Sequence, residues 1–183
     1  MAITINGDGT LTGISVGGLP DGIVDTDMLA TDAVTAAKIG SLPSGSILQV
    51  VQTIKSNIFT TTSSSFVDVT GLSASITPSS SSNKILCVVN VGIGTSSTGA
   101  DNKVQVLRGS TEIVANDVLV RTDSVSICQN WNISVLDSPS TTSATTYKVQ
   151  VLSESTHTVK VNSRNSEAGG DGISTITLME VAA

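Results

Sequence analysis

Residues 125–135 read Val-Ser-Ile-Cys-Gln-Asn-Trp-Asn-Ile-Ser-Val, and this stretch decides the fold class. Val, Ile and Trp side chains alternate in it with Ser, Cys and Asn. A period of two places the apolar side chains on one face of an extended strand. The stretch therefore predicts a long strand with one buried face. Trp131 shares that face with aliphatic neighbours, so we expect it to pack in a core rather than to stack on a sugar.

Shorter stretches on either side show the same alternation: Lys103–Val106, Tyr147–Val151 and Thr158–Val161. Ile85–Val89 is apolar on both faces, which places it in the interior or at a contact between subunits. Segments rich in Ser, Thr, Gly and Asn separate the stretches, at 77–83, 92–101, 137–146 and 167–172. About nine or ten short strands spaced in this way predict a mainly β protein, an antiparallel jelly-roll-like β-sandwich. An immunoglobulin-like sandwich is the alternative.

The 183 residues are aliphatic and rich in hydroxyl groups, with aromatic residues at only 2% and charged residues at 13%. A core must therefore be built from Val, Ile, Leu and Ala, which suit strands. The net charge of −6 lacks the positive field that attracts nucleic acid. No apolar run is long enough to span a bilayer and no signal segment opens the chain, so neither secretion nor membrane insertion is expected.

Groups able to carry chemistry are few. The two cysteines, Cys87 and Cys128, are expected to be free thiols, with one bridge between them as the alternative. His157 is the only histidine, and without identifiable partners it supplies neither a metal site nor a triad, so a surface position is expected. Gly13–Gly17 matches the Gly-x-Ser-x-Gly pattern, but no helical pattern follows it. The sequence thus predicts no catalytic residue, no metal site and no cofactor.

Residues 1–43 form a separate unit, with five Asp against one Lys. Asn6–Gly9 supplies turn residues between two short alternating stretches and predicts a small hairpin. Asp32 can cap a short helix that ends before Gly40. So short a helix is marginal alone, and we expect its small side chains to meet other copies at a threefold axis. These expected trimer contacts are Ala30, Ala33, Val34 and Ala37.

Several stretches belong together in a larger pattern. Ile3–Thr10, Gly22–Leu29 and Asp32–Ile39 are similar to the units that open many tail fibres and related appendage proteins of tailed bacteriophages, notably those of aquatic bacteria. Gly45–Gln52 resembles the first strand of their distal head domains. The remaining matching stretches are Thr77–Ile85, Leu136–Tyr147 and Thr175–Val181. The resemblance implies a homotrimeric protein of the virion, assembled in the host cytoplasm.

The resemblance also implies a function, that of a tail-fibre or spike subunit. Residues 1–43 would attach to the particle and hold the trimer, and a head of residues 44–183 would contact the host surface. The expected partners are other virion proteins, of tail or capsid, and a host receptor such as a carbohydrate. The alternative is a head decoration, cement or head-fibre protein on the capsid. A carbohydrate-active depolymerase is more distant, because the acids of the sandwich form no recognisable pair.

Receptor contacts are expected in loops rather than in strands, because loops on a rigid sandwich carry recognition. Three segments are candidates: 96–102, 116–123 and 165–171. The side chains in them expected to contact a receptor are Ser97, Asp101, Asn102, Asn116, Asp117, Asn165 and Asp171.

Overall fold

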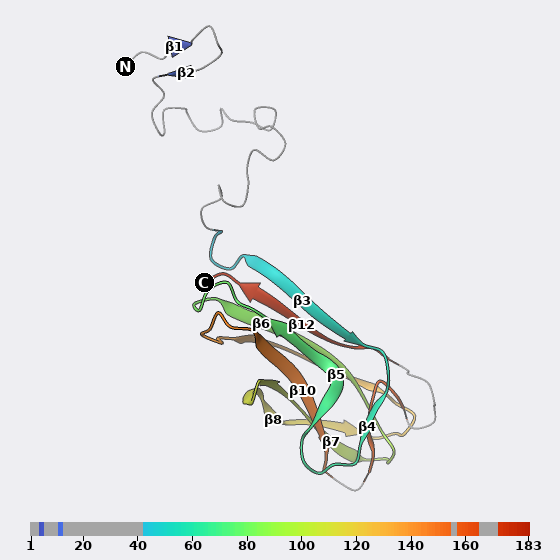
Figure 1. Cartoon of the computed structure of the whole chain (residues 1–183). Coiled ribbons are helices and arrows are strands. Elements are labelled where there is room, and N and C mark those ends of the chain that lie inside the picture. The colour runs from blue at the N-terminus through green and yellow to red at the C-terminus, as the bar shows by residue number, and fades with distance from the viewer. Residues whose placement is uncertain (1–3, 6–10, 13–41, 155–156, 165–171) are drawn as a thin grey trace. The chain divides into compact units, whose positions relative to one another are not determined.

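The computed structural model describes residues 4–5, 11–12, 42–154, 157–164 and 172–183, and within strands it leaves the side chains of 4–5, 11–12, 115–119 and 122 undescribed (Figure 1). The chain divides into two units, Met1–Leu42 and Pro43–Ala183. In the first unit, β1 (Thr4–Ile5) pairs antiparallel with β2 (Leu11–Thr12), so the predicted hairpin is confirmed. The predicted helix and its stripe of Ala30, Ala33, Val34 and Ala37 lie outside the described residues, and the trimer contact stays a prediction.

The second unit is built from strands only, within its described residues. They are β3 (Ile47–Lys55), β4 (Phe59–Thr61), β5 (Val67–Ile76), β6 (Lys84–Thr95), β7 (Ala100–Arg108), β8 (Thr111–Thr122), β9 (Gln129–Asp137), β10 (Thr145–Ser153), β11 (Val159–Val161) and β12 (Ser174–Val181). All the pairings between them are antiparallel. The predicted mainly β, antiparallel class is confirmed.

Two sheets face each other in this unit. One has the order β5-β10-β7-β8. In the other, β9 pairs with one edge of β6 and β12 with the opposite edge, and β3 follows β12. The short strands β11 and β4 continue the rows of β12 and β3 at the far end of β6. Each sheet is thus four rows wide, and the alternation of the chain between the sheets is that of a jelly roll, as predicted.

One face of each strand forms the core. β6 shows the pattern most clearly, because Ile85, Cys87, Val89, Val91 and Ile93 are all fully buried between the sheets. Aromatic residues contribute little to the core, apart from Tyr147 and Trp131. The expected packing of Trp131 in the core is confirmed. Aliphatic, β-branched side chains on alternate positions therefore hold the two sheets together.

The structure corrects three strand boundaries. β9 begins at Gln129, because residues 125–126 form a turn, and Ile127 is exposed rather than part of a buried face. The predicted loop 92–101 shrinks to residues 96–99, since β6 and β7 extend into it. The predicted loop 116–123 is strand up to Thr122, because β8 pairs with β7 along this length. Cross-strand pairing outweighs the turn preference of Asn and Asp here.

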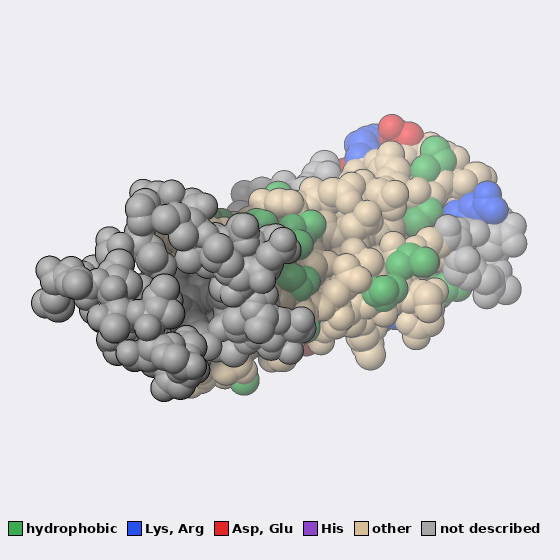
Figure 2. Space-filling model, turned by 90° about the horizontal axis from the view of Figure 1, so that it is seen from above, with side chains coloured by type: hydrophobic (Ala, Val, Ile, Leu, Met, Phe, Trp, Pro, Cys, Tyr) green, Lys and Arg blue, Asp and Glu red, His purple; other side chains and the backbone are tan. Residues whose placement is uncertain are grey.

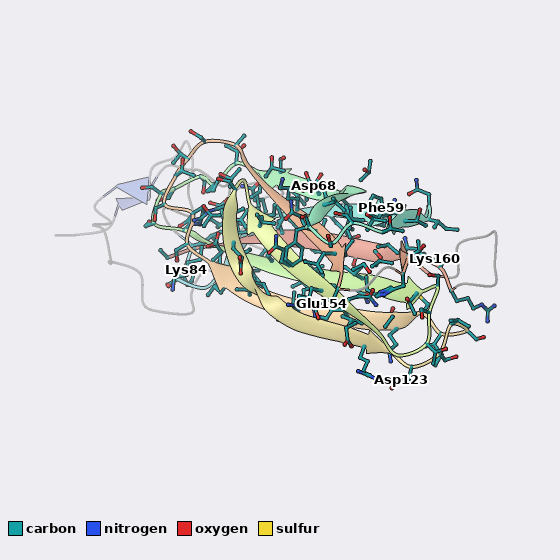
Figure 3. The ribbon with its side chains drawn as sticks, turned by 90° about the horizontal axis from the view of Figure 1, so that it is seen from below. Phe59, Asp68, Lys84, Asp123, Glu154 and Lys160 are labelled. Atoms are coloured by element: carbon teal, nitrogen blue, oxygen red, sulfur yellow. The ribbon has the colours of Figure 1, made fainter. Side chains whose placement is uncertain are left out.

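The two ends of the sandwich are formed by different parts of the chain. Gly45 and Ser46 are joined to Ala182 by backbone hydrogen bonds of 2.8 and 2.9 Å, so the first and last residues of the head lie at one end, called here the proximal end. The 96–99 turn and the 123–128 segment lie at the opposite, distal end. Figure 3 shows this separation, with Lys84 at one end and Asp123 and Lys160 at the other. In the described part of the chain, no helix is long and apolar enough to cross a bilayer.

Candidate functional site

Charged side chains gather at the distal end, on the outer face of the sheet that contains β7 and β8. Asp101 and Arg121 are cross-strand partners, which places their side chains side by side. Arg121 Nη1 lies 3.5 Å from Asp101 Oδ1, and Arg121 Nε donates to Asp123 Oδ1 at 3.1 Å. The Arg121 side chain is 58% exposed. An arginine held between two carboxylates in this way presents its remaining N–H groups to solvent.

An open hollow of about 510 Å³ lies beside Arg121, where the edge strand β8 of one sheet faces the edge strand β9 of the other. Its lining residues are Val120, Arg121, Gln129, Asn130 and Trp131. The guanidinium and the two amides supply hydrogen-bond donors and acceptors, the groups that recognise hydroxyl-rich or amide-bearing ligands. Trp131 is only 8% exposed and adds an apolar floor rather than a stacking platform.

A buried polar cluster supports the distal end from inside. His157 Nε2 lies 2.8 Å from Asn102 Oδ1 and 3.2 Å from Ser153 Oγ. Asn102 Nδ2 also donates to the carbonyl of Val120, at 3.2 Å. Burial lowers the pKa of His157, and the nearby Asp101 offsets part of that effect. The expected surface position of His157 is therefore wrong: the ring is buried and joins β7, β8 and β10 beneath the charged groups.

The predicted receptor-contact residues have different outcomes. Ser97 is exposed in the 96–99 turn and Asp101 is half-buried beside Arg121, so both are at the distal end. The predicted receptor contact of Asn102 is wrong, because its side chain is fully buried and cannot reach a receptor. The backbone of Asn116 and Asp117 lies in β8 rather than in a loop, and their side chains are outside the description, as are Asn165 and Asp171 entirely. Arg121 lies within the candidate segment 116–123 but was not singled out, and Gln129 and Asn130 lie outside all three candidate segments; the structure brings the three residues together.

A second polar cluster ties the sheets together at the proximal end. Arg108 Nη1 donates to both carboxylate oxygens of Asp137, at 3.0 and 2.8 Å, and the Tyr147 hydroxyl donates to Asp137 Oδ2 at 2.7 Å. Burial, followed by the hydrogen bond to Asp137, raises the pKa of Tyr147. An open hollow of about 460 Å³ beside Arg108 is lined mainly by Ser and Thr of the 108–111 and 139–146 segments. This network joins β7, β9 and β10, and within it the positive charge of Arg108 is paired with the negative charge of Asp137.

Glu180 is the most strongly perturbed carboxylate among the described residues. It is 1% exposed and accepts hydrogen bonds from Ser79, Asn83 and Gln49. These bonds outweigh burial and lower the pKa of Glu180 to about 2. The carboxylate anchors the 77–83 loop to the last strand, and both of its oxygens accept hydrogen bonds within the head. Its hydrogen bonds give it a structural role at the proximal end.

No arrangement for metal or thiol chemistry occurs in the described residues. They contain no group of three His, Cys, Asp or Glu placed to hold a metal ion. Cys87 and Cys128 are free thiols, as expected. Burial, with a smaller contribution from Asp137, raises the pKa of Cys87 to about 12, so this thiol is protonated at neutral pH.

Comparison with known proteins gives structural likeness only. No protein-family model matches the chain, and no curated protein matches it. The chain is similar to the structure of infectious bursal disease virus strain Gx, with a TM-score of 0.40 and 13% identity over 76% of this chain. It is likewise similar to the VP2 subviral particle of infectious bursal disease virus, with a TM-score of 0.40 and 12% identity over 74% of this chain. The match covers 37% and 38% of those chains, little more than a third of their length.

Proposed function

We propose that this chain is a structural subunit of a tailed-bacteriophage virion, a tail-fibre or spike protein that binds a surface and catalyses no reaction. The observation that carries the proposal is the separation of the two ends of the head. The chain enters the head at the proximal end, where Gly45 and Ser46 bond to Ala182. The exposed polar hollow with Arg121 lies at the opposite end, free to meet another surface. An adhesin head attached through residues 1–43 requires this polarity.

The resemblance of the 1–43 segment to the opening units of phage appendages supports the same proposal. The many Ser and Thr side chains and the low charge of the head suit contact with a polar, hydroxyl-rich surface. A receptor of carbohydrate type fits the chemistry of the distal hollow, where one guanidinium and two amides stand over an apolar floor. The proposed partners are therefore two: a virion protein at the proximal side and a host glycan at the distal end.

Gold-labelled antibodies against the full chain, applied to purified particles of the phage that encodes it, test the virion location. Label at the tail or at the tips of its appendages is expected. Label spread over the capsid shell would favour the decoration alternative and contradict the tail-fibre role. Particles without any label would overturn the proposal as a whole.

Binding of the fluorescent full chain to host cells tests the distal hollow. Arg121→Ala is expected to reduce binding about tenfold, because the described lining of the hollow then loses its one cation and its best hydrogen-bond donors. Lys148→Ala is the matched control, since Lys148 lies on the same sheet and pairs with Asp68 away from the hollow. Equal losses for the two variants, or none for Arg121→Ala, would contradict binding at this end.

A further inference from the structure

Most of the outer surface of the head is polar, but one area is not. The outer face of the sheet containing β7 and β10 carries ion pairs and hydrogen-bonded amides. Lys148 and Gln150 both donate hydrogen bonds to Asp68. Gln105 donates one to Gln150. The outer face of the other sheet instead exposes large aliphatic side chains. Val50 is 57% exposed, Ile54 60% and Leu136 49%. The two outer faces of one sandwich therefore meet different surroundings.

The exposed aliphatic side chains are in register across the sheet. Val50 of β3 pairs with Met179 of β12, Met179 pairs with Leu86 of β6, and Leu86 pairs with Leu136 of β9. Side chains directly opposite each other in neighbouring strands share one face. The four residues thus form a continuous apolar row across the full width of the sheet, called here the outer row. It crosses the proximal half of the face.

The surroundings of the outer row resemble the margin of a protein interface. The next cross-strand row toward the distal end consists of Gln52, Thr177, Val88 and Ser134, which are uncharged and, apart from Val88, polar. The row after it contains Ile54 and Asn132 and is likewise uncharged. At the outward positions of the described strands, the charged residues are Lys84 at the proximal margin and Lys160 at the distal margin. Figure 2 views the head from the side on which β3 lies and shows apolar side chains among uncharged ones over most of the described surface. An apolar centre with an uncharged polar rim is the usual anatomy of a protein interface.

The size of this face also fits an interface. Four strands about 4.8 Å apart, each contributing residues about 3.3 Å apart over positions equivalent to 48–54, cover on the order of 300 Å². A specific interface takes roughly 800 Å² from each partner, of which an apolar centre is a part. The outer row with its polar rim therefore supplies the central portion of such a contact.

The net charge and the direction of the chain indicate which partner covers the outer row, namely a second copy of this chain. The chain carries a net charge of −6, so two copies repel each other unless they meet over an uncharged surface, and this face is uncharged between its margins. β3 begins four residues after Pro43, so the outer row is at the end of the head where the chain arrives from residues 1–43. Wherever the N-terminal segments of several copies are held together, this end of each head is the part brought closest to the other copies.

We propose that the outer row is the contact between heads of neighbouring copies of this chain in its homo-oligomer. The proposal rests on the proposed tail-fibre function and on the homotrimer that the sequence resemblance implies, and it deepens that function because it assigns a surface of the head to the assembly. Like faces converge around the symmetry axis, and each outer row is buried against the rows of the other copies. The distal hollows then remain outside the contact and can bind in parallel, which raises the avidity for a repetitive surface.

Light scattering after size exclusion, over a range of concentrations of the full chain, tests the contact. Wild type is expected at three times 18.6 kDa. The double variant Val50→Lys/Leu136→Lys places charges in the row and is expected to dissociate at concentrations at least about tenfold higher than wild type does. Thr70→Lys/Ser73→Lys, at exposed positions of β5 in the other sheet, is the matched control and should associate like wild type.

A second measurement needs no variant. In hydroxyl-radical footprinting of the wild-type chain, oxidation of Met179 is expected to fall as concentration rises and the row becomes buried. Unchanged oxidation of Met179 through association would overturn the contact. So would a trimer that the Val50 and Leu136 changes leave as tight as wild type, and that result would leave the proposed trimer itself in place. A monomer at every concentration would overturn both the contact and the trimer, while the gold-labelling result on virion location would stand.

Discussion

Ser79 donates two hydrogen bonds to a single oxygen of Glu180: its backbone N–H lies 2.6 Å and its hydroxyl 2.7 Å from Oε1. The two residues are separated by 101 positions in the chain. Asn83 adds a third donor to the same oxygen at 2.6 Å, and Gln49 donates to Oε2. One buried carboxylate thus fixes the 77–83 loop, the last strand and the first strand of the head at the proximal end. Charge-assisted bonds of this kind are the strong ones.

Acid should therefore weaken the head in a defined pH window. The pKa of Glu180 is about 2 in the folded head and about 4.5 when unperturbed, so the unfolded chain binds the proton first. The stabilisation is complete above about pH 4.5 and is lost as pH falls toward 2, for a total of roughly 3 kcal/mol. Urea unfolding of the full chain at several pH values measures this. Glu180→Gln should lower the unfolding free energy at pH 7 by about 2 kcal/mol and flatten this part of the profile.

The control for that experiment is Ser73→Ala, a change that adds or removes no titratable group at an exposed position of β5. This variant should keep the wild-type acid profile. An equally steep loss between pH 4.5 and 2 in the Glu180→Gln variant would show that other groups cause it.

A second, higher pH window belongs to His157. Burial lowers its pKa in the folded head, so the unfolded chain takes up the proton at a higher pH than the folded chain does. The stability contributed by neutral His157 is present above its ordinary pKa of about 6.5 and falls as pH drops below it. Nuclear magnetic resonance of the ring protons should give a folded-state pKa below 6.5. A pKa at or above 6.5 would contradict the buried cluster with Asn102 and Ser153.

Gly94 should tolerate no side chain. A Cβ atom at this position would lie 2.1 Å from the backbone oxygen of Ser163, which passes directly over β6. Backbone cannot yield as a flexible side chain can, so Gly94→Ala should lower the unfolding free energy by about 2–3 kcal/mol. Gly172→Ala is the matched control, because a Cβ there meets no atom of the described residues within 4 Å. Thermal unfolding of both variants measures the difference, and equal melting temperatures would contradict the close approach.

Cys87 should be unreactive in the folded protein. Its pKa of about 12 leaves on the order of one thiolate in ten thousand molecules at pH 8, and the side chain is fully buried. In the Cys128→Ser variant, which has Cys87 as its only thiol, a disulfide reagent should react with almost none of the protein until denaturant is added. Rapid reaction without denaturant would indicate that β6 opens locally.

The β class and much of the strand content could be predicted because a period of two is a local signal. Residues 103–106, 147–151 and 158–161 all lie in or at strands of the structure. The period of two gave a wrong prediction where alternating residues have no partner strand to pair with. Residues 124–128 alternate like a strand yet include a turn, because β9 has its partner in β6 only from Gln129 onward.

The candidate site was less accessible to prediction than the fold. Ser97 was predicted in a loop and lies in the 96–99 turn, because loops can be inferred from composition, whereas Asp101, predicted in the same loop, lies in β7. Asn102, one residue further on, points inward to His157, and a single step along a strand reverses the face. Arg121 and Asn130 lie close together because β8 and β9, the edge strands of the two sheets, face each other. No local sequence pattern predicts which sheet edges face each other. The Glu180 network is hidden for the same reason, since its donors lie about a hundred positions away or more.

The bonds that join Gly45 and Ser46 to Ala182 have a mechanical consequence. A pull on the head at Pro43, against a hold at the distal end, acts along the axis of β3. The β3–β12 ladder, which runs from Ile47 to Lys55, then bears the load in shear, with its hydrogen bonds strained together rather than opened one after another. In the proposed virion role, a particle pulled away by flow would therefore load the β-sheet in its strongest direction, and the head would resist unfolding at the point where residues 1–43 join it.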